Sequence, residues 1–141
     1  MEIRFQNSPK ETATMSTKEL RENFLVQELM QADVVKLVYS HYDRVIIGGA
    51  KPVSKKLELP NEPELKANFF LERREVGIIN VGGKGTVEAD GASYEIDKLE
   101  AVYLGKGTKE VGFTSADAND PAKRHQAFFV PLFCQRTTRL V

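Results

Sequence analysis

Glycine residues divide the stretch Phe69–Gly107 into short apolar runs, and this punctuation limits the folds that the chain can adopt. The run Val76–Val81 ends at a glycine-rich turn. Further along, Asp90-Gly91 separates Thr86–Ala89 from Ser93–Ile96. Apolar runs of this length between glycine turns predict strands, and Asp-Gly between two of them predicts a hairpin. The stretch is therefore predicted to form an antiparallel β unit.

The rest of the chain adds one predicted helix and more strands. Ser16 and Glu19 have the spacing of a capping box, and the apolar residues after them follow a helical period, which predicts a helix over residues 17–30. The preceding Met1–Met15 is polar and predicts a flexible or strand-exchanged arm. Strand-like runs occur at Val34–Tyr39, Arg44–Ile47, Val53–Leu59, Ala101–Leu104 and Glu110–Thr114, and a last apolar run at Ala127–Phe133.

Composition excludes several classes of function. The 141 residues are enough for one core, and 20 basic against 20 acidic residues give a net charge of zero, which disfavours nucleic acid and anionic membranes as partners. Cys134 stands alone, so no internal disulfide forms, and no leader or long apolar segment is present. The glycines at Gly82–Gly85 open a strand rather than a helix, so they do not predict a phosphate loop. We expect a soluble, cytoplasmic protein.

The order of parts predicts a mainly β fold, a cupin-like double-stranded β-helix (jelly-roll barrel) with one N-terminal helix. Cupins commonly hold a metal with three histidines and one carboxylate, and Glu75 and Gly82 keep the family spacing between the carboxylate and a following glycine. The positions expected for the first two histidines fall near Asn68 and Phe70, or one residue later, and the third falls on Glu110. The sequence therefore predicts the scaffold without the metal cage.

Two groups of titratable residues are candidate catalytic sites. Arg73 and Glu75 are two residues apart on a predicted strand, so their side chains share one face. They are interpreted either as a carboxylate-binding arginine with a proton-transfer glutamate, or as a structural ion pair, and the structural interpretation is favoured. His41, beside Asp43, is interpreted either as a proton shuttle or as part of a local polar network.

Four separated motifs closely resemble the amino-terminal half of the bacterial 5-keto-4-deoxyuronate isomerases, also called 4-deoxy-L-threo-5-hexosulose-uronate ketol-isomerases. The most specific is the run FLERREVGIIN. The motifs are Leu20–Val26, Tyr39–Gly49, Phe70–Gly83 and Tyr103–Gly107.

This resemblance implies a ketol isomerase of pectin and uronate breakdown that converts 5-keto-4-deoxyuronate to 2,5-diketo-3-deoxygluconate. It also implies a bicupin that forms homo-oligomeric hexamers and binds zinc through ligands of the carboxy-terminal cupin, which are not present in this chain. The alternative is a non-catalytic cupin module that binds a uronate-like ligand or drives oligomerisation.

The predicted organisation is an N-terminal arm (1–16), a cupin-like domain (17–123) and a divergent tail (124–141). After Lys123 the sequence departs from the family pattern. We interpret that departure as a truncated or frame-shifted product, or as deliberate shortening. The isolated chain is then expected to be inactive.

Overall fold

The computed structural model describes residues 1–116, so the predicted run Ala127–Phe133, Cys134 and the divergent tail lie outside the described residues. Strands dominate the described part. In chain order its elements are β1 (Glu2–Arg4), α1 (Pro9–Thr12), α2 (Thr17–Phe24), β2 (Val35–Ser40), β3 (Val45–Ala50), β4 (Leu57–Glu58), the 3₁₀ helix η1 (Pro63–Leu65), β5 (Val76–Ile79), β6 (Gly85–Ala89), β7 (Ala92–Ile96), β8 (Ala101–Leu104) and β9 (Val111–Ser115).

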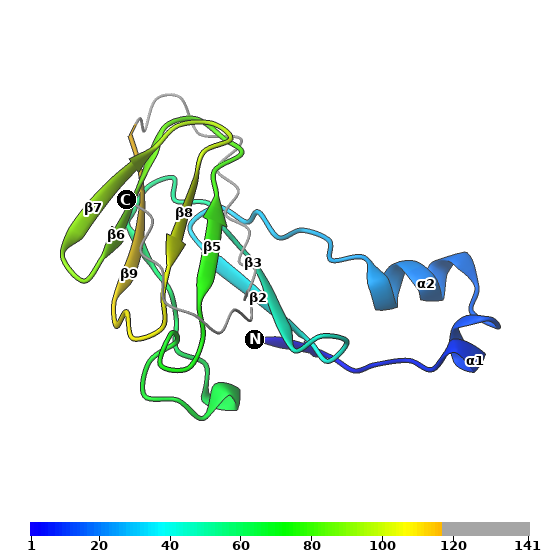
Figure 1. Ribbon diagram of the computed structural model, residues 1–141. Helices are drawn as coiled ribbons and strands as arrows, with labels where there is room; N and C mark the ends of the chain where they lie inside the picture. The colour runs from blue at the N-terminus through cyan, green and yellow to red at the C-terminus, as the bar shows by residue number, and fades with distance from the viewer. Residues whose placement is uncertain (117–141) are drawn as a thin grey trace.

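The strands form three sheets, with the orders β1-β2-β3, β4-β9-β6-β7 and β5-β8. Neighbouring strands run antiparallel, except that β1 is parallel to β2. In Figure 1 the β5-β8 pair and the four-stranded sheet lie together in one body. The predicted mainly β, cupin-like fold is confirmed.

The Asp90-Gly91 hairpin forms as predicted. It joins β6 to β7, with Ala89 opposite Ala92. Asp90 has φ +46° and Gly91 has φ +83°, the positive pair that a two-residue type I′ turn requires. The Asp90 carboxylate accepts hydrogen bonds from the backbone N–H groups of Lys109 and Glu110, both at 2.9 Å, and so ties this hairpin to the start of β9.

The first thirty residues differ most from the prediction. The predicted arm contains β1, which pairs with β2 of the same chain, and a second short helix, α1, with its own capping box between Ser8 and Glu11. The predicted helix over 17–30 ends at Phe24. No residue of α2 is buried, so no tertiary packing supports further turns, and a helix this short is marginal by itself.

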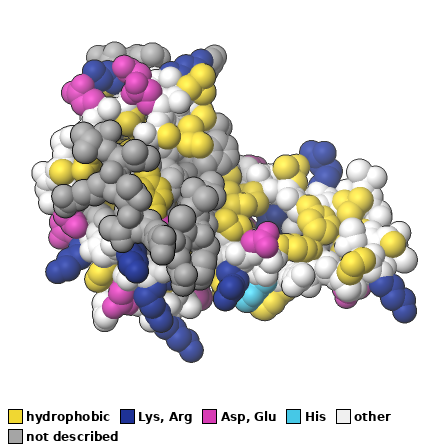
Figure 2. Space-filling model, in the orientation of Figure 1, with side chains coloured by type: hydrophobic (Ala, Val, Ile, Leu, Met, Phe, Trp, Pro, Cys, Tyr) yellow, Lys and Arg dark blue, Asp and Glu magenta, His cyan; other side chains and the backbone are white. Residues whose placement is uncertain are grey.

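Residues 5–30 form what we call the helical projection, because in Figure 1 both helices stand away from the sheets. Figure 2 shows hydrophobic side chains on its surface. Phe5 is 72% exposed, and Phe24 and Leu25 are also exposed. The projection returns to the body over β3, where the Leu29 carbonyl oxygen lies 2.6 Å from the place that a Cβ on Gly49 would occupy.

The alternating run Val53–Leu59 was predicted as one strand, but only Leu57 and Glu58 pair, both with β9. The Asp33 carboxylate is the reason, because its Oδ1 accepts hydrogen bonds from the backbone N–H groups of Val53 (2.8 Å) and Ser54 (2.9 Å). Those groups are therefore not available to a strand ladder.

The core fills the space between the sheets with aliphatic and aromatic side chains. Asn80 is the buried polar residue among them, 4% exposed, and it follows β5 directly. Its Nδ2 donates to the carbonyls of Gly83 (2.7 Å) and Ile96 (3.0 Å), and its Oδ1 accepts from the N–H of Gly82 (3.0 Å). The core side chains include Leu37, Ile46, Leu71, Val76, Ile78, Val87, Ile96, Leu104 and Phe113.

Asn80→Asp tests this network with a nearly isosteric change. The carboxylate cannot donate to the carbonyls of Gly83 and Ile96, and it places a charge in the core, so we expect a loss of about 3 kcal/mol in the free energy of unfolding. Urea denaturation measures it. Asn61→Asp is the matched control, because Asn61 makes one exposed hydrogen bond, to the Ala67 carbonyl. Equal losses in the two variants would contradict the role given to Asn80.

Asp33 provides a test of pH dependence. Hydrogen bonds from the Ser54 hydroxyl, then from the backbone of Ser54 and Val53, lower the pKa of Asp33 from 3.8 to about 2. The folded form therefore favours the carboxylate, and this contribution to stability is complete above the unfolded pKa and is lost as the pH falls from about 4 to about 2. At neutral pH, the urea midpoint of the wild-type protein should be higher than that of Asp33→Asn. The difference between the two midpoints should shrink as the pH falls from about 4 to about 2. Asp97→Asn, at an exposed turn, controls for general charge effects. A difference that does not vary with pH would exclude this linkage.

Candidate functional site

The side chain of Arg73, a predicted catalytic residue, forms hydrogen bonds with backbone carbonyls. One guanidinium nitrogen, Nη2, donates to the carbonyls of Leu65 (3.2 Å) and Lys66 (2.7 Å). Lys66 ends η1 in the left-handed conformation, with φ +46°, so Arg73 satisfies carbonyls at the end of that helix. This arrangement supports a structural role through the backbone rather than through a carboxylate partner.

Glu75 and its neighbour Arg74 lie directly before β5. Among the described residues, Nη1 of Arg74 and Oε2 of Glu75 are the buried side-chain nitrogen and oxygen atoms that lack a hydrogen-bond partner. No ion pair between Arg73 and Glu75 occurs among the salt bridges of the described residues. Sequence reasoning selected Arg73 and Glu75 but not Arg74, although Arg74 belongs to a run of four successive charged residues, Glu72–Glu75, before an apolar strand.

His41 lies in the turn between β2 and β3, apart in sequence and in sheet from the Arg73–Glu75 segment. Its ring stacks on Phe5, with centroids 4.9 Å apart, and meets Tyr39 edge-on at 5.0 Å. The adjacent Tyr42 hydroxyl accepts hydrogen bonds from the backbone and side chain of Asn7. These contacts attach the helical projection to the sheet. A catalytic role for His41 stays a prediction.

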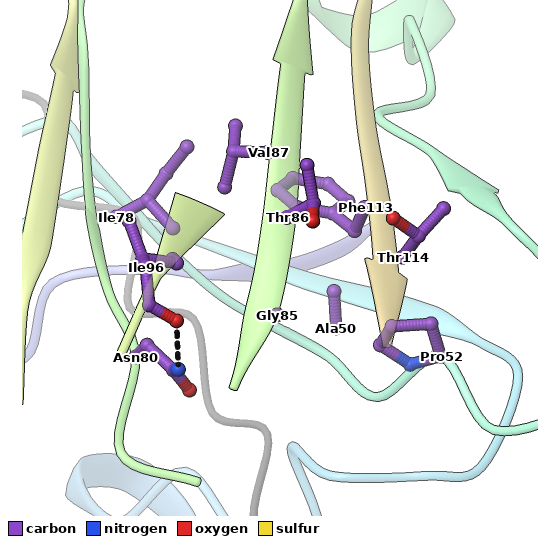
Figure 3. A pocket seen from close by; sticks show the side chains of 10 residues that line it. All are labelled: Ala50, Pro52, Ile78, Asn80, Gly85, Thr86, Val87, Ile96, Phe113 and Thr114. Carbon is purple, nitrogen blue, oxygen red and sulfur yellow. Dashed lines mark hydrogen bonds between the residues drawn. The ribbon is translucent and has the colours of Figure 1, made fainter. Parts of the chain in front are cut away.

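The core contains a small cavity that is lined in part by Asn80. Its volume is about 30 Å³, which is on the scale of a single water molecule and far below that of a six-carbon sugar acid. Figure 3 shows the mainly apolar side chains that line it, with the hydrogen bond from Asn80 to Ile96 at one side. The lining residues are Ala50, Pro52, Ile78, Asn80, Gly85, Thr86, Val87, Ile96, Phe113 and Thr114.

A wider groove of about 720 Å³ separates α2 from β1 and β2. Its charges are largely paired with one another, since Arg4 bonds Glu2 at 2.7 Å and Lys18 lies 3.8 Å from Glu22. The groove is large enough for a ligand, but it presents a mixed and open surface. It is lined by Glu2, Arg4, Thr17, Lys18, Arg21, Glu22, Leu25, Gln27, Glu28 and Lys36.

Comparison with known proteins finds relatives that share one name. The 4-deoxy-L-threo-5-hexosulose-uronate ketol-isomerase of Lachnoclostridium phytofermentans is 49% identical over 123 residues, which are 87% of this chain and 45% of that protein. The protein of the same name from Formosa agariphila is 49% identical over 122 residues, 86% of this chain and 44% of that protein. The chain is similar to these ketol-isomerases over most of its own length and over less than half of theirs.

Other relatives of the chain carry the same name, and no family model matches the chain. Ketol-isomerase 2 of Enterococcus faecalis is 46% identical over 123 residues. The chain spans about 45% of the length of these ketol-isomerases, which is consistent with the amino-terminal part that the sequence motifs indicated.

None of the helices in residues 1–116 has the length and apolar character needed to cross a lipid bilayer.

The zinc that the resemblance to ketol-isomerases suggests does not fit the described residues. Within residues 1–116, no group of three or more His, Cys, Asp or Glu side chains is placed to hold a metal ion. The predicted position of the third histidine is occupied by Glu110, so an imidazole ligand is absent there. No catalytic step is therefore assigned to a metal bound by these residues.

Arg73→Met separates the two interpretations of Arg73. If its guanidinium supports η1, removing hydrogen bonds to two carbonyls should lower the free energy of unfolding by about 1 kcal/mol. Chemical denaturation measures the change, and Lys98→Met, at an exposed turn position, is the control. An Arg73→Met protein as stable as wild type would refute the structural role.

Proposed function

We propose that this chain forms the amino-terminal cupin of a ketol-isomerase that converts 5-keto-4-deoxyuronate to 2,5-diketo-3-deoxygluconate. The observation that carries the proposal is the 49% identity to proteins named for this activity, extending over 87% of the chain. The mainly β fold supports it, because strands from the sheets of residues 1–116 contribute to one hydrophobic core.

The proposed reaction moves a proton between neighbouring carbons. A base removes a proton from the carbon next to a carbonyl, an enediolate forms, and a proton returns at the adjacent carbon. The negative charge of the enediolate has to be stabilised, and a zinc ion supplies such stabilisation as a Lewis acid when one is bound. Because residues 1–116 provide no matching ligand group, we place the zinc in the part of the isomerase that lies outside the region matched by this chain.

The proposed contribution of this cupin is to support the site rather than to enclose the reaction. Its interior cavity of about 30 Å³ has no room for the substrate. Its helical projection carries exposed apolar side chains, including Phe5, Phe24 and Leu25, which supports assembly with further chains as a homo-oligomer. The sugar acid is then bound where this cupin meets other parts of the enzyme.

A chimera tests the proposed function. Residues 1–123 of this chain replace the matching region of the Lachnoclostridium phytofermentans ketol-isomerase, and loss of 5-keto-4-deoxyuronate is followed by nuclear magnetic resonance. We expect the chimera to turn over substrate within about tenfold of the parent enzyme, because the replaced region keeps its fold and its contacts.

The isolated chain is the control, assayed with added zinc and analysed for bound metal. We expect no turnover and no stoichiometric zinc. A folded chimera without isomerase activity would contradict the proposal and favour a non-catalytic module. Turnover with stoichiometric zinc by the isolated chain would instead contradict the division of roles between the two parts.

A further inference from the structure

β1 is an edge strand with an open outer side. It ends the sheet order β1-β2-β3, so within residues 1–116 no further strand continues this sheet. In Figure 1 it is the dark blue strand that starts at the mark N. An unpaired edge is a template for a strand from another chain, and proteins commonly block such edges with proline or lysine. β1 contains neither residue, and its Glu2 and Ile3 are exposed.

The backbone of Ile3 points to the open side. β1 runs parallel to β2, and the N–H of His41 donates to the Arg4 carbonyl at 2.9 Å, so the backbone polar groups of Arg4 point toward β2. These groups alternate between the two sides of a strand, hence those of Ile3 point away from β2. The centre of the edge therefore offers one donor and one acceptor to a further strand.

The charges of β1 indicate which strand fits. Two copies of one strand that pair antiparallel make a two-fold symmetric contact. Among the registers that let outward-pointing backbone groups meet, those centred on Glu2 or on Arg4 place two like charges opposite each other, which is destabilising. The register centred on Ile3 instead places Glu2 of each copy opposite Arg4 of the other. A second copy of β1 is therefore complementary in charge and in backbone direction.

Both charged side chains have atoms available for this contact. Nε of Arg4 donates to Oε1 of Glu2 in its own chain, and Nη1 of Arg4 donates to the carbonyls of Asn23 and Leu25. Within residues 1–116, Nη2 of Arg4 and Oε2 of Glu2 make no hydrogen bond. Both side chains line the open groove beside α2, so the side chains of a second strand have room to reach them.

The opposite face of the edge is apolar. Ile3 is 38% exposed and Phe5 is 72% exposed, and the Phe5 ring stacks on His41, which continues the register of β1 with β2 by one residue. Ile3 and Phe5 are two residues apart, so their side chains share one face of the extended segment. In the register centred on Ile3 the two Ile3 side chains meet on the two-fold axis, and this contact removes apolar surface from water.

We propose that β1 pairs antiparallel with β1 of a second copy of this chain, in the register centred on Ile3. The two three-stranded sheets then join edge to edge into one continuous sheet. The pairing goes beyond the proposed function and does not depend on it. Because few residues of each copy take part, the contact is weak by itself, with a Kd of about 0.1 mM.

Sedimentation velocity of the full chain, from about 10 µM to about 1 mM, tests the pairing. We expect a monomer that converts to a dimer across this range. Glu2→Arg places arginines opposite one another at the contact and should weaken association about tenfold or more. Glu64→Arg is the matched control, because it makes the same charge change at an exposed residue of η1 and should associate as wild type does.

Exchanging the two charges tests the register. Glu2→Arg combined with Arg4→Glu in one chain again places opposite charges across the contact, so the double variant should recover the association that Glu2→Arg loses. The registers centred on residues 2 and 4 do not predict this recovery, because like charges stay opposite each other in both. Circular dichroism checks that each variant is folded, since Arg4 also bonds two carbonyls near the end of α2.

Ile3→Pro tests the backbone contact without changing charge. It removes the N–H that points outward and leaves the bonds from Glu2 and Arg4 to β2, and proline is tolerated on an edge strand when its missing N–H faces solvent. We expect loss of the dimer with a melting temperature close to that of wild type, whereas Ile3→Val should keep the dimer. This comparison also replaces the charge exchange if Arg4→Glu does not fold.

Three results would overturn the proposal. One is a chain that stays monomeric at about 1 mM. Another is a dimer that Glu2→Arg and Ile3→Pro leave unchanged, and that Phe24→Ser disrupts, because the contact would then lie on α2. The third is a monomeric chain in which Ile3→Pro lowers the melting temperature of the chimera alone, which would assign the edge to the rest of the enzyme. None of these results depends on turnover by the chimera, so the proposed isomerase function is tested separately.

Discussion

The amide of Asn80 connects two parts of the molecule that no strand pairing connects directly. β5 belongs to a two-stranded sheet with β8, and β7 lies at the end of the four-stranded sheet. Asn80 follows β5, and its side chain bonds the end of β7 at Ile96 and the turn that leads from β5 to β6. Buried backbone groups where a chain leaves one sheet for another have no ladder partner, so a side chain has to satisfy them. The side chain of Asn80 has both a donor and an acceptor, so it can satisfy the carbonyls of Gly83 and Ile96 and the N–H of Gly82 together.

The consequence for function is a well-filled core between the sheets. Around Asn80 the interior is packed with Ile78, Val87, Ile96 and Phe113, and the space that remains is on the scale of one water molecule. Chemistry on a sugar acid is therefore excluded from that cavity. Among residues 1–116, the buried side-chain atoms that stay unsatisfied belong to Arg74 and Glu75, before β5.

The helical projection depends on a different kind of interaction. None of the residues in its helices is buried. Its attachment includes the ring contact of Phe5 with His41, the hydrogen bonds from Asn7 to the Tyr42 hydroxyl, and the passage of Leu29 over Gly49. A segment with so little internal packing keeps its shape mainly through its ends, and its exposed apolar side chains are available to other chains. His41 contributes to this attachment through its stacked contact with Phe5.

The sequence by itself determined the features that depend on neighbouring residues. Alternation and glycine turns located most strands, Asp90-Gly91 specified its hairpin, Ser16 and Glu19 marked the start of α2, and the run FLERREVGIIN indicated the family. What only the tertiary structure decided involves residues far apart in the chain. The pairing of β5 with β8 and the parallel addition of β1 to β2 both join residues that are far apart in the chain. Asp33 shortens the strand before Leu59 in the same way, through hydrogen bonds to a distant segment. Arg73 reaches carbonyls of another turn, whereas one nitrogen of Arg74 has no partner. A charged side chain has the same local pattern whether or not a carbonyl from another turn reaches it, so the sequence could select Arg73 and Glu75 as candidates but could not say which groups lack a partner.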